Sequence, residues 1–468
     1  MEFINRQEEI KYIDEAKDLS KNKLFSLSIS GLRRVGKTRL VLEILKKEDL
    51  YFFVNKDKTS QSLLFEYEEI LKNKRILNEL ESLKNWEDFF NVLFNRFKGI
   101  VVFDEFQNFR NVEPLIFGLL QKYIDLNENK KNLLLIFSGS LIGLMKKLFS
   151  DKKEPLYGRV KRKLSLRPFS FRNSLLICQE LKIKDIEEAI ILYALFGGFP
   201  KYYVAIEDEN LRGASFETIF DKFFFVKNAV FEDEVNEILS MEFGKRSGLY
   251  YDILTAIANG CTSISQIASF LRKKETALTR QLNELFKYFE LIDYEKQIIG
   301  KKKIIFIKHP LINFWFKYFY KNLSAYKRRE NWLIEKIKRE INNYIGKRFE
   351  IICQDFLQLE TSFNFLGKQW GKIPNIPKEK NQYEIDIVAL NEENKEILFC
   401  ECKWKDKVNL QGIVKELIEK SKFVPWNNEE RKEYFAVFAK SFKKKISSFD
   451  GKKVYCFDLK DIEKLMKK

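Results

Sequence analysis

The stretch from Gly31 to Thr38 constrains the fold of this chain more than any other. Its spacing, Gly31-x-x-x-x-Gly36-Lys37-Thr38, matches a phosphate-binding loop. Glycines let the backbone curl so that successive N–H groups face an anion, and the following helix adds its positive end. Lys37 is expected to reach the β- and γ-phosphates of a nucleoside triphosphate, and Thr38 to ligate Mg²⁺. The expected nucleotide contacts in the loop are Gly31, Leu32, Arg33, Arg34, Val35, Gly36, Lys37 and Thr38.

The flanks of this loop have the patterns that a phosphate loop requires. Residues 24–30 (LFSLSIS) alternate apolar and small polar side chains like a strand, and residues 38–47 (TRLVLEILKK) have apolar side chains at helical spacing. The alternative is a glycine-containing turn with a solvated lysine. The flanks favour the phosphate loop, so we expect nucleotide binding.

A second acidic element follows in residues 99–109 (GIVVFDEFQNF), an apolar strand that ends at Asp104 and Glu105. We expect Asp104 to hold the Mg²⁺ shell and Glu105 to polarise the attacking water. A strand that leads into a solvated turn has the same pattern. The position downstream of a phosphate loop favours the catalytic interpretation.

Further strand candidates complete an α/β pattern. Residues 133–137 are apolar and lead into Ser138, which is either a γ-phosphate sensor or a helix N-cap. With 51–54 and 163–166, five strand candidates alternate with helical stretches. This alternation predicts an α/β fold with a mostly parallel sheet and the nucleotide at the carboxyl ends of its strands.

Composition excludes several classes of mechanism. The only histidine among 468 residues is His309, so neither a Ser-His triad nor a histidine metal site is central here. The six cysteines lack zinc-finger spacing, and we expect reduced, mostly buried thiols. No apolar run approaches the roughly 18 residues of a membrane helix, and the first residues lack signal-peptide architecture. We expect a cytoplasmic protein with no membrane partner.

The net charge of +17 favours a polyanionic partner such as double-stranded DNA. A Lys- and Glu-rich surface of the kind common in hyperthermophiles is the alternative explanation.

Residues 248–309 change to a pattern of helix, turn, helix and a two-stranded wing, as in a winged helix. The basic turn and the start of the second helix carry the candidate DNA contacts Lys273, Lys274, Thr276 and Arg280. The wing lysines at positions 301–303 would contact phosphates. The alternative is a lid that closes over the nucleotide without binding DNA. The aromatic-rich segment after Pro310 is explained best by core packing.

Two alternating strands near the C-terminus, residues 383–390 (YEIDIVAL) and 396–404 (EILFCECKW), carry Asp386, Glu401 and Lys403. With Glu350 on an upstream helix, this is the arrangement of a PD-(D/E)xK nuclease core. The carboxylates could hold Mg²⁺, and the lysine could neutralise developing phosphate charge. The alternative is a set of ordinary cross-strand ion pairs on a solvated sheet face.

Several motifs occur together in one order: FINRQEE (3–9), GLRRVGKTRL (31–40), VVFDEFQNF (101–109), FSGS (137–140), PLYGR (155–159) and GGFPKYY (197–203). Over roughly the first 230 residues the chain resembles the archaeal ATPase family, among the STAND-type and AAA-like P-loop ATPases. The C-terminal hairpin, with LGKQWGK (366–372) before it, resembles the DUF234 domain that follows such ATPase domains and is related to the nuclease fold.

The resemblance implies ATP and Mg²⁺ as cofactors and assigns further nucleotide contacts. Asn5 and Arg6 would lie against the base or ribose, and Gly198 and Pro200 would touch the adenine. Arg159 would sense the γ-phosphate or reach a neighbouring subunit in a homo-oligomer formed on nucleotide binding. A surface arginine in a glycine turn is the alternative for Arg159.

Taken together, these patterns predict three domains: an ATPase with a small helical lid (1–235), a winged-helix module (236–325) and a nuclease-like domain (326–468). We expect an ATP-dependent molecular switch that acts on DNA. The alternatives are an ATP-gated, Mg²⁺-dependent DNA endonuclease and a nucleotide-dependent protein-interaction scaffold. DNA binding that weakens with salt would separate the first two functions from the scaffold.

Overall fold

The computed structural model describes residues 3–244, 248–377 and 381–467. The chain forms two compact units, and it passes between them several times. The first unit contains the chain up to Pro168 together with Phe199–Lys201 and Asn283–Glu290. The second contains Phe169–Gly198, Tyr202–Leu282 and the chain from Leu291 onward. This division differs from the three consecutive domains expected from the sequence.

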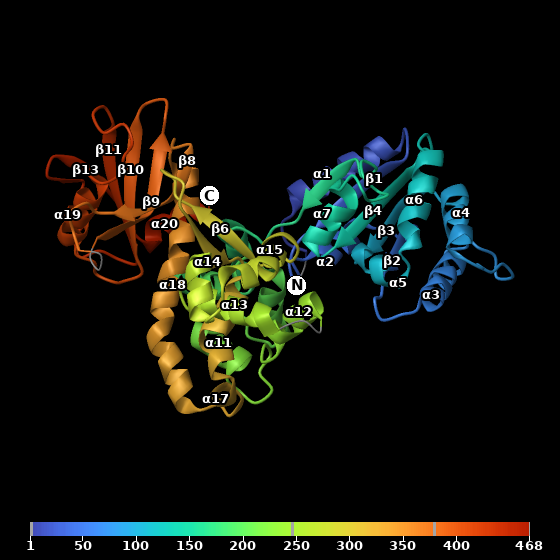
Figure 1. Cartoon of the computed structure of the whole chain (residues 1–468), viewed down its shortest axis with the longest axis horizontal. Coiled ribbons are helices and arrows are strands. Elements are labelled where there is room, and N and C mark those ends of the chain that lie inside the picture. Colours follow the sequence, from blue (N-terminus) through green and yellow to red (C-terminus); the bar gives the residue numbers. More distant parts are fainter. Residues whose placement is uncertain (1–2, 245–247, 378–380, 468) are drawn as a thin grey trace. The chain divides into compact units, whose positions relative to one another are not determined.

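The first unit is built on a five-stranded sheet in which every strand pairing is parallel (Figure 1). All five strands lie where the sequence predicts them, which confirms the α/β fold class. In sheet order, the strands are β2 (Leu50–Phe53), β3 (Gly99–Asp104), β4 (Leu133–Gly139), β1 (Phe25–Ser30) and β5 (Arg162–Ser165). Because the strands are parallel, the carboxyl ends of β1, β3 and β4 lie at the same edge of the sheet.

Helices cover both faces of this sheet, as parallel sheets require. A large aromatic core, with Phe52, Phe103, Phe106 and Phe137 fully buried, packs against α4 and α6. The helical elements of this unit are α1 (Gln7–Ser20), α2 (Lys37–Ile44), α3 (Ser60–Asn73), α4 (Trp86–Arg96), η1 (Phe106–Asn108), α5 (Phe109–Val112), α6 (Leu115–Leu126) and α7 (Ile142–Ser150).

The second unit begins with a helical bundle whose aromatic side chains meet helices from much later in the chain. The ring of Phe220 lies 5.8 Å from that of Phe314, and the ring of Phe224 lies 5.5 Å from that of Phe319. The aromatic segment after Pro310 is buried, as predicted. The bundle contains α8 (Phe171–Glu180), α9 (Ile186–Phe196), α10 (Pro200–Asp208), α11 (Phe216–Phe224), α12 (Glu234–Phe243), α16 (Pro310–Tyr318), η3 (Tyr320–Asn322), α17 (Leu323–Lys327) and α18 (Asn331–Glu360).

The elements between residues 248 and 307 follow the order expected of a winged helix. Helix α14 begins with a capping box formed by Ser263 and Gln266, and the Thr262 carbonyl accepts a hydrogen bond from Ile305 N at 2.8 Å. The elements are α13 (Gly248–Ala258), α14 (Ile264–Phe270), η2 (Glu275–Leu278), α15 (Thr279–Lys287), β6 (Ile292–Lys296) and β7 (Lys303–Ile307). The assignment to the winged-helix class stays a prediction.

A six-stranded mixed sheet, in the order β12-β13-β11-β10-β9-β8, forms the C-terminal part of the second unit. Helix α19 packs on one face through Val414 and Leu417, and α18 packs on the other, where Phe356 meets Phe438. The elements are β8 (Phe365–Lys372), β9 (Gln382–Asn391), β10 (Glu396–Lys403), α19 (Leu410–Ser421), β11 (Lys432–Ala439), β12 (Ser448–Phe449), β13 (Lys452–Phe457) and α20 (Leu459–Met466).

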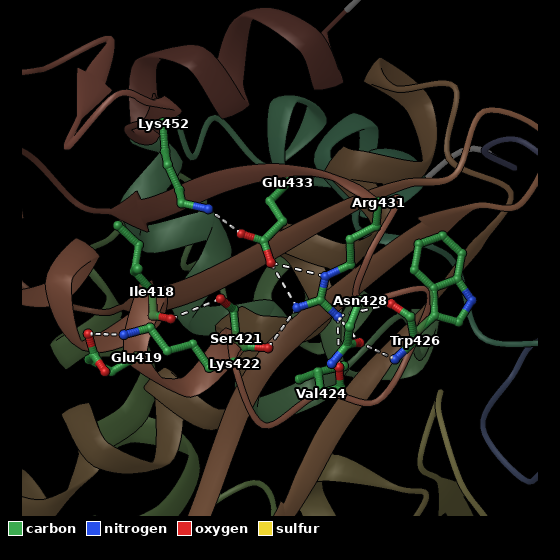
Figure 2. A network of polar contacts seen from close by, with 10 residues as sticks. All are labelled: Ile418, Glu419, Ser421, Lys422, Val424, Trp426, Asn428, Arg431, Glu433 and Lys452. Atoms are coloured by element: carbon green, nitrogen blue, oxygen red, sulfur yellow. Dashed lines mark hydrogen bonds and ion pairs between the residues drawn. The ribbon is translucent and has the colours of Figure 1, made fainter.

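One buried arginine organises the connection between α19 and β11. The Arg431 side chain is 4% exposed, and it donates to the carbonyls of Ser421 and Val424 at 2.9 and 2.7 Å (Figure 2). Its guanidinium also pairs with Glu433, which in turn meets Lys452. Both carbonyls also accept backbone hydrogen bonds, from Val424 N and Trp426 N, so the arginine adds to the contacts that close the loop.

The six cysteines are free thiols, four of them buried, as expected. Within the described residues, no single helix combines the length and apolar character needed to span a membrane; the bent pair Ile186–Phe196 and Pro200–Asp208 meets that criterion only jointly.

Candidate functional sites

The phosphate-loop sequence connects β1 to α2, and its two glycines are required by geometry. Gly36 has φ +94°, in the left-handed region that favours glycine. A Cβ on Gly31 would lie 2.5 Å from the Leu166 carbonyl oxygen, closer than atoms can pack. The spacing read from the sequence therefore corresponds to one tight turn and one close approach of neighbouring backbone.

The loop places Lys37 and Thr38 at the carboxyl ends of the central strands. The buried Lys37 Nζ donates to the carbonyls of Gly31 and Leu32 at 2.9 and 3.1 Å. Thr38 Oγ1 donates to Asp104 Oδ2 at 2.8 Å. The hydroxyl and the carboxylate are oxygen ligands of the kind Mg²⁺ prefers, so this pair fits the expected ion.

Tyr51 is a part of this site that sequence reasoning missed. Its hydroxyl donates to Asp104 Oδ2 at 2.8 Å. Burial, followed by the charge of Asp104, raises the pKa of the Tyr51 phenol, so the phenol stays a donor. The sequence identified the strand of Tyr51 but contained no indication that its side chain reaches Asp104.

Two further side chains that the sequence analysis did not assign hold the predicted water-polarising carboxylate. Glu105 Oε2 accepts a hydrogen bond from Ser140 Oγ at 2.7 Å and another from Gln107 Nε2. The neighbouring Ser138, predicted as either a γ-phosphate sensor or a helix N-cap, is fully buried at the end of β4, and its hydroxyl has no hydrogen-bond partner in the described parts of the chain. It does not cap a helix, because the N-cap residue of α7 is Leu141; the sensor role stays a prediction.

Asn5 and Arg6 form a left-handed corner, with φ values of 62° and 74°. The buried Arg6 donates to the carbonyls of Val35 and Arg167 at 3.3 and 2.8 Å and pairs with Glu9 at 2.6 Å. Arg6 thus supports the phosphate loop by direct contact. The predicted contact of Asn5 and Arg6 with base or ribose stays a prediction.

The other residues assigned through the family resemblance lie in different settings. Pro200 Cγ is 3.8 Å from the position of a Cβ on Gly36, which places Pro200 beside the loop. Gly198 belongs to the second unit, where its carbonyl accepts from Phe169 N at 2.8 Å. The adenine contacts of both residues stay predictions.

Arg159 is not brought to the loop by any described contact. Its guanidinium pairs with both oxygens of Asp125, at 2.9 and 2.7 Å, and also donates to the carbonyls of Pro155 and Tyr157. These are the contacts of a surface arginine in a turn. A role at the γ-phosphate would require Arg159 to leave Asp125, and it stays a prediction.

The candidate DNA contacts Lys273, Lys274, Thr276 and Arg280 are all exposed. So are the lysines at positions 301–303 at the tip of the wing. The same hairpin also contacts β8, because Ile298 N donates to the Lys368 carbonyl at 3.0 Å and Ile299 N donates to Gln369 Oε1 at 3.1 Å.

The C-terminal candidates come from three elements: Glu350 from α18, Asp386 from β9, and Glu401 with Lys403 from β10. Lys403 Nζ lies 2.6 Å from Glu401 Oε1, and Asp386 Oδ2 accepts from Cys402 N at 2.8 Å. Burial and then the charge of Asp386 raise the pKa of Glu350; burial and then the charge of Glu401 raise the pKa of Asp386. The three carboxylates therefore share one electrostatic environment.

Two lysines that the sequence analysis did not assign enter this carboxylate cluster. Lys368 pairs with Glu350 at 3.0 Å and with Glu384 at 2.5 Å, and Lys420 lies 3.6 Å from Glu401. Across the described ranges, no group of three or more His, Cys, Asp or Glu side chains is placed to hold a metal ion. Any Mg²⁺ here would have to rely on fewer carboxylates, with water or substrate supplying the rest.

The fold and the loop geometry are those of an α/β domain of the P-loop class. The Walker-type ATPase PABY2304 of Pyrococcus abyssi has a similar structure, with a TM-score of 0.53, 23% sequence identity, and coverage of 67% of this chain and 96% of that one. Residues 3–206 match a family described as an ATPase domain predominantly from Archaea. Residues 315–413 match DUF234, described as archaeal and bacterial proteins of unknown function.

The chain is also similar over its whole length to a curated protein. The uncharacterized protein MJECL04 of Methanocaldococcus jannaschii is 30% identical over 479 aligned residues, covering 98% of this chain and 99% of the relative. This protein belongs to the archaeal ATPase family and carries a C-terminal DUF234 domain. The family assignment made from the motifs is confirmed.

Proposed function

We propose that this protein is a molecular switch that binds and hydrolyses ATP with Mg²⁺. The observation that carries the proposal is the 2.8 Å hydrogen bond between Thr38 of the phosphate loop and Asp104 at the end of β3. These two oxygens come from the two elements that hold the ion in P-loop enzymes. Bound Mg²⁺ would neutralise charge on the β- and γ-phosphates.

The remaining chemistry falls to side chains at the same strand ends. The Lys37 ammonium, now held by loop carbonyls, would exchange them for phosphate oxygens that carry full negative charge. Glu105 would orient the attacking water, and the Ser138 hydroxyl is available to donate to the γ-phosphate. The loop N–H groups would bind the phosphates without reorganisation.

The test compares ATP turnover and nucleotide binding in Lys37→Ala and Glu105→Gln with the wild type. Lys37→Ala should lose turnover and most nucleotide affinity. Glu105→Gln should bind ATP but turn it over at least about 100-fold more slowly. Arg39→Gln, which alters an exposed ion pair on the same helix α2, is the matched control. Wild-type turnover by Glu105→Gln would exclude the assignment of the strand-end pair.

We infer that the switch acts on double-stranded DNA through the turn before α15. The exposure of Lys273, Lys274 and Arg280 and the net charge of +17 support this. Replacing the three by alanine should lower the slope of log affinity against log salt by about one per lost phosphate contact. Lys152→Ala with Lys153→Ala, which removes two exposed lysines of the first unit, is the control. An unchanged slope would exclude DNA contact by this turn and would favour the alternative, in which the module is a lid over the nucleotide.

A second candidate function is a Mg²⁺-dependent nuclease at the carboxylate cluster. The specific support is the raised pKa of Glu350 and Asp386, together with a buried Glu401 oxygen, Oε2, that has no hydrogen-bond partner in the described structure. Burial, and then the charge of a neighbouring carboxylate, disfavours the ionised form of both groups, so a bound cation would stabilise them. Plasmid nicking with Mg²⁺ or Mn²⁺ that is lost in Asp386→Asn and kept in Glu392→Gln would establish it. The absence of nicking by the wild type would reject it.

A further inference from the structure

Two loops that follow β10 and β11 are joined along their length. Past the strand ends, Lys440 N donates to the Lys405 carbonyl at 3.1 Å, and Val408 N donates to the Ser441 carbonyl at 3.0 Å. Lys443 N then donates back to the Val408 carbonyl at 3.1 Å. We call residues 403–407, which are the last residue of β10 and the loop after it, and residues 440–445, after β11, the lysine loops.

The lysine loops concentrate positive charge. Their sequences, KWKDK and KSFKKK, contain seven lysines and a single aspartate. Backbone hydrogen bonds hold the two lysine-bearing segments side by side, although like charges repel. A fold that fixes such a cluster bears a cost that an anionic partner would offset.

Some of these lysines are already neutralised inside the protein. Lys403 pairs with Glu401, Lys440 pairs with Asp406 and Glu187, and Lys445 pairs with Asp458 and Asp461. Their nitrogen–oxygen distances lie between 2.5 and 2.9 Å.

The other four, Lys405, Lys407, Lys443 and Lys444, are exposed. They form no ion pair within 4.0 Å in the part of the chain that the structure describes. Their charges are therefore available to an external anion.

The loop backbone is held in place from within. Ser441 Oγ accepts from Lys407 N at 2.9 Å and donates to Asp406 Oδ1 at 3.0 Å. Helix α19 starts directly after the first loop at Leu410, with Asn409 as its cap. The positive end of that helix adds to the field of the lysines.

We propose that the lysine loops bind the phosphodiester backbone of duplex DNA. Lysine ammonium groups bind phosphates as point charges and carry no base-specific fork geometry. The loops contain two aromatic side chains: Trp404 is buried and Phe442 is half-buried. Neither is exposed for stacking on a base. The surface thus binds DNA independently of sequence.

This inference rests on the proposed action on DNA, but it assigns a surface separate from the turn before α15. Lys403 links the surface to the carboxylate cluster, because it opens the first lysine loop and pairs with Glu401. A duplex held by the loops would present its phosphates next to that cluster.

The test uses the full chain and a fluorescent duplex of mixed sequence, with affinity measured between about 50 and 200 mM salt. The variant replaces Lys405, Lys407, Lys443 and Lys444 by glutamine. Its slope of log affinity against log salt should fall by about 3.6, which corresponds to four lost contacts with B-DNA. ATP turnover and the thermal unfolding midpoint should not change.

A matched control replaces four exposed lysines of the first unit, Lys23, Lys56, Lys152 and Lys153, by glutamine and removes the same charge. Equal weakening in this control would overturn the proposal, since net charge alone would then explain the effect. Loss of binding to anionic phospholipid vesicles without loss of DNA binding would also overturn it.

The failure of this proposal can be distinguished from failure of the DNA role itself. A wild type that does not bind duplex DNA would reject both. A wild type whose DNA binding is abolished by the changes at Lys273, Lys274 and Arg280, and is unaffected by the four lysine-loop changes, would reject only the lysine-loop surface.

Discussion

At the scale of single residues, the orientation of Glu105 depends on Ser140. Ser140→Ala removes one of the two hydrogen bonds to Glu105 Oε2. We expect kcat for ATP hydrolysis to fall about 10-fold, the worth of one such bond, with KM little changed.

Ser140→Thr keeps the hydroxyl and is the matched control, so it should restore kcat. An alanine variant with the kcat of the wild type would mean that Ser140 does not position Glu105 for the reaction.

Asp355 on α18 gives a prediction about pH. Burial raises the pKa of its carboxyl to about 6, although a hydrogen bond from the Phe171 backbone partly opposes this. At a pH between the ordinary pKa of 3.8 and about 6, the Asp355 carboxyl holds a proton in the folded state that it has released in the unfolded state. Stability should therefore fall as pH rises through this window. Asp355→Asn should flatten the fall and raise the unfolding midpoint at pH 7, measured by thermal unfolding.

Sequence reasoning identified the residues whose chemistry follows from a local pattern. Lys37, Thr38 and Asp104 belong to motifs whose spacing determines their positions, and the structure joins Thr38 to Asp104. Tyr51 and Lys368 could not be found this way. Their roles depend on which strands are neighbours and in what register, information that a single sequence does not carry.

At the scale of elements, the tip of the wing is attached to β8. The bond from Ile298 N to the Lys368 carbonyl, 3.0 Å long, joins the turn of the hairpin to β8. Ile298→Pro removes the donor. We expect faster hydrogen exchange in residues 365–372, measured by mass spectrometry, with ATP turnover unchanged. Lys302→Ala, in the same hairpin, should leave exchange as in the wild type. Unchanged exchange in the proline variant would mean that β8 does not depend on the wing.

The strands of the first unit were predictable because apolar runs bounded by polar residues are local features. The division into two units could not be predicted from such local features. Helix α9 packs with α16 and α18, more than a hundred residues later, and Phe220 of α11 meets Phe314 of α16, so the bundle after Pro168 joins the C-terminal part. Helix α2 is also shorter than its pattern indicates, because Asp49 accepts from Lys46 N at 2.9 Å just beyond its end.

At the scale of the whole molecule, two units with separate hydrophobic cores should unfold in two steps. ATP with Mg²⁺ should raise only the unfolding midpoint of the unit that contains the phosphate loop. At an ATP concentration 100 times the dissociation constant, the free energy of unfolding of that unit should rise by about 2.7 kcal/mol. Calorimetry with and without nucleotide measures this.

Lys37→Ala should abolish the shift caused by nucleotide, and Asp386→Asn should preserve it. A single transition that moves as a whole with ATP would mean that the two units unfold cooperatively.

The path of the chain has a consequence for synthesis. Residues Asn283–Glu290 belong to the first unit, where Tyr288 accepts from Gly143 N at 3.1 Å and Glu290 pairs with Lys146. When the ribosome has completed β5, the last strand of the five-stranded sheet, it has therefore not yet synthesised one segment of the ATPase unit. At about 5–20 residues per second, that piece follows Pro168 by roughly 6 to 25 seconds. During this interval the nascent ATPase must remain incomplete, so its final assembly waits on the middle of the polypeptide.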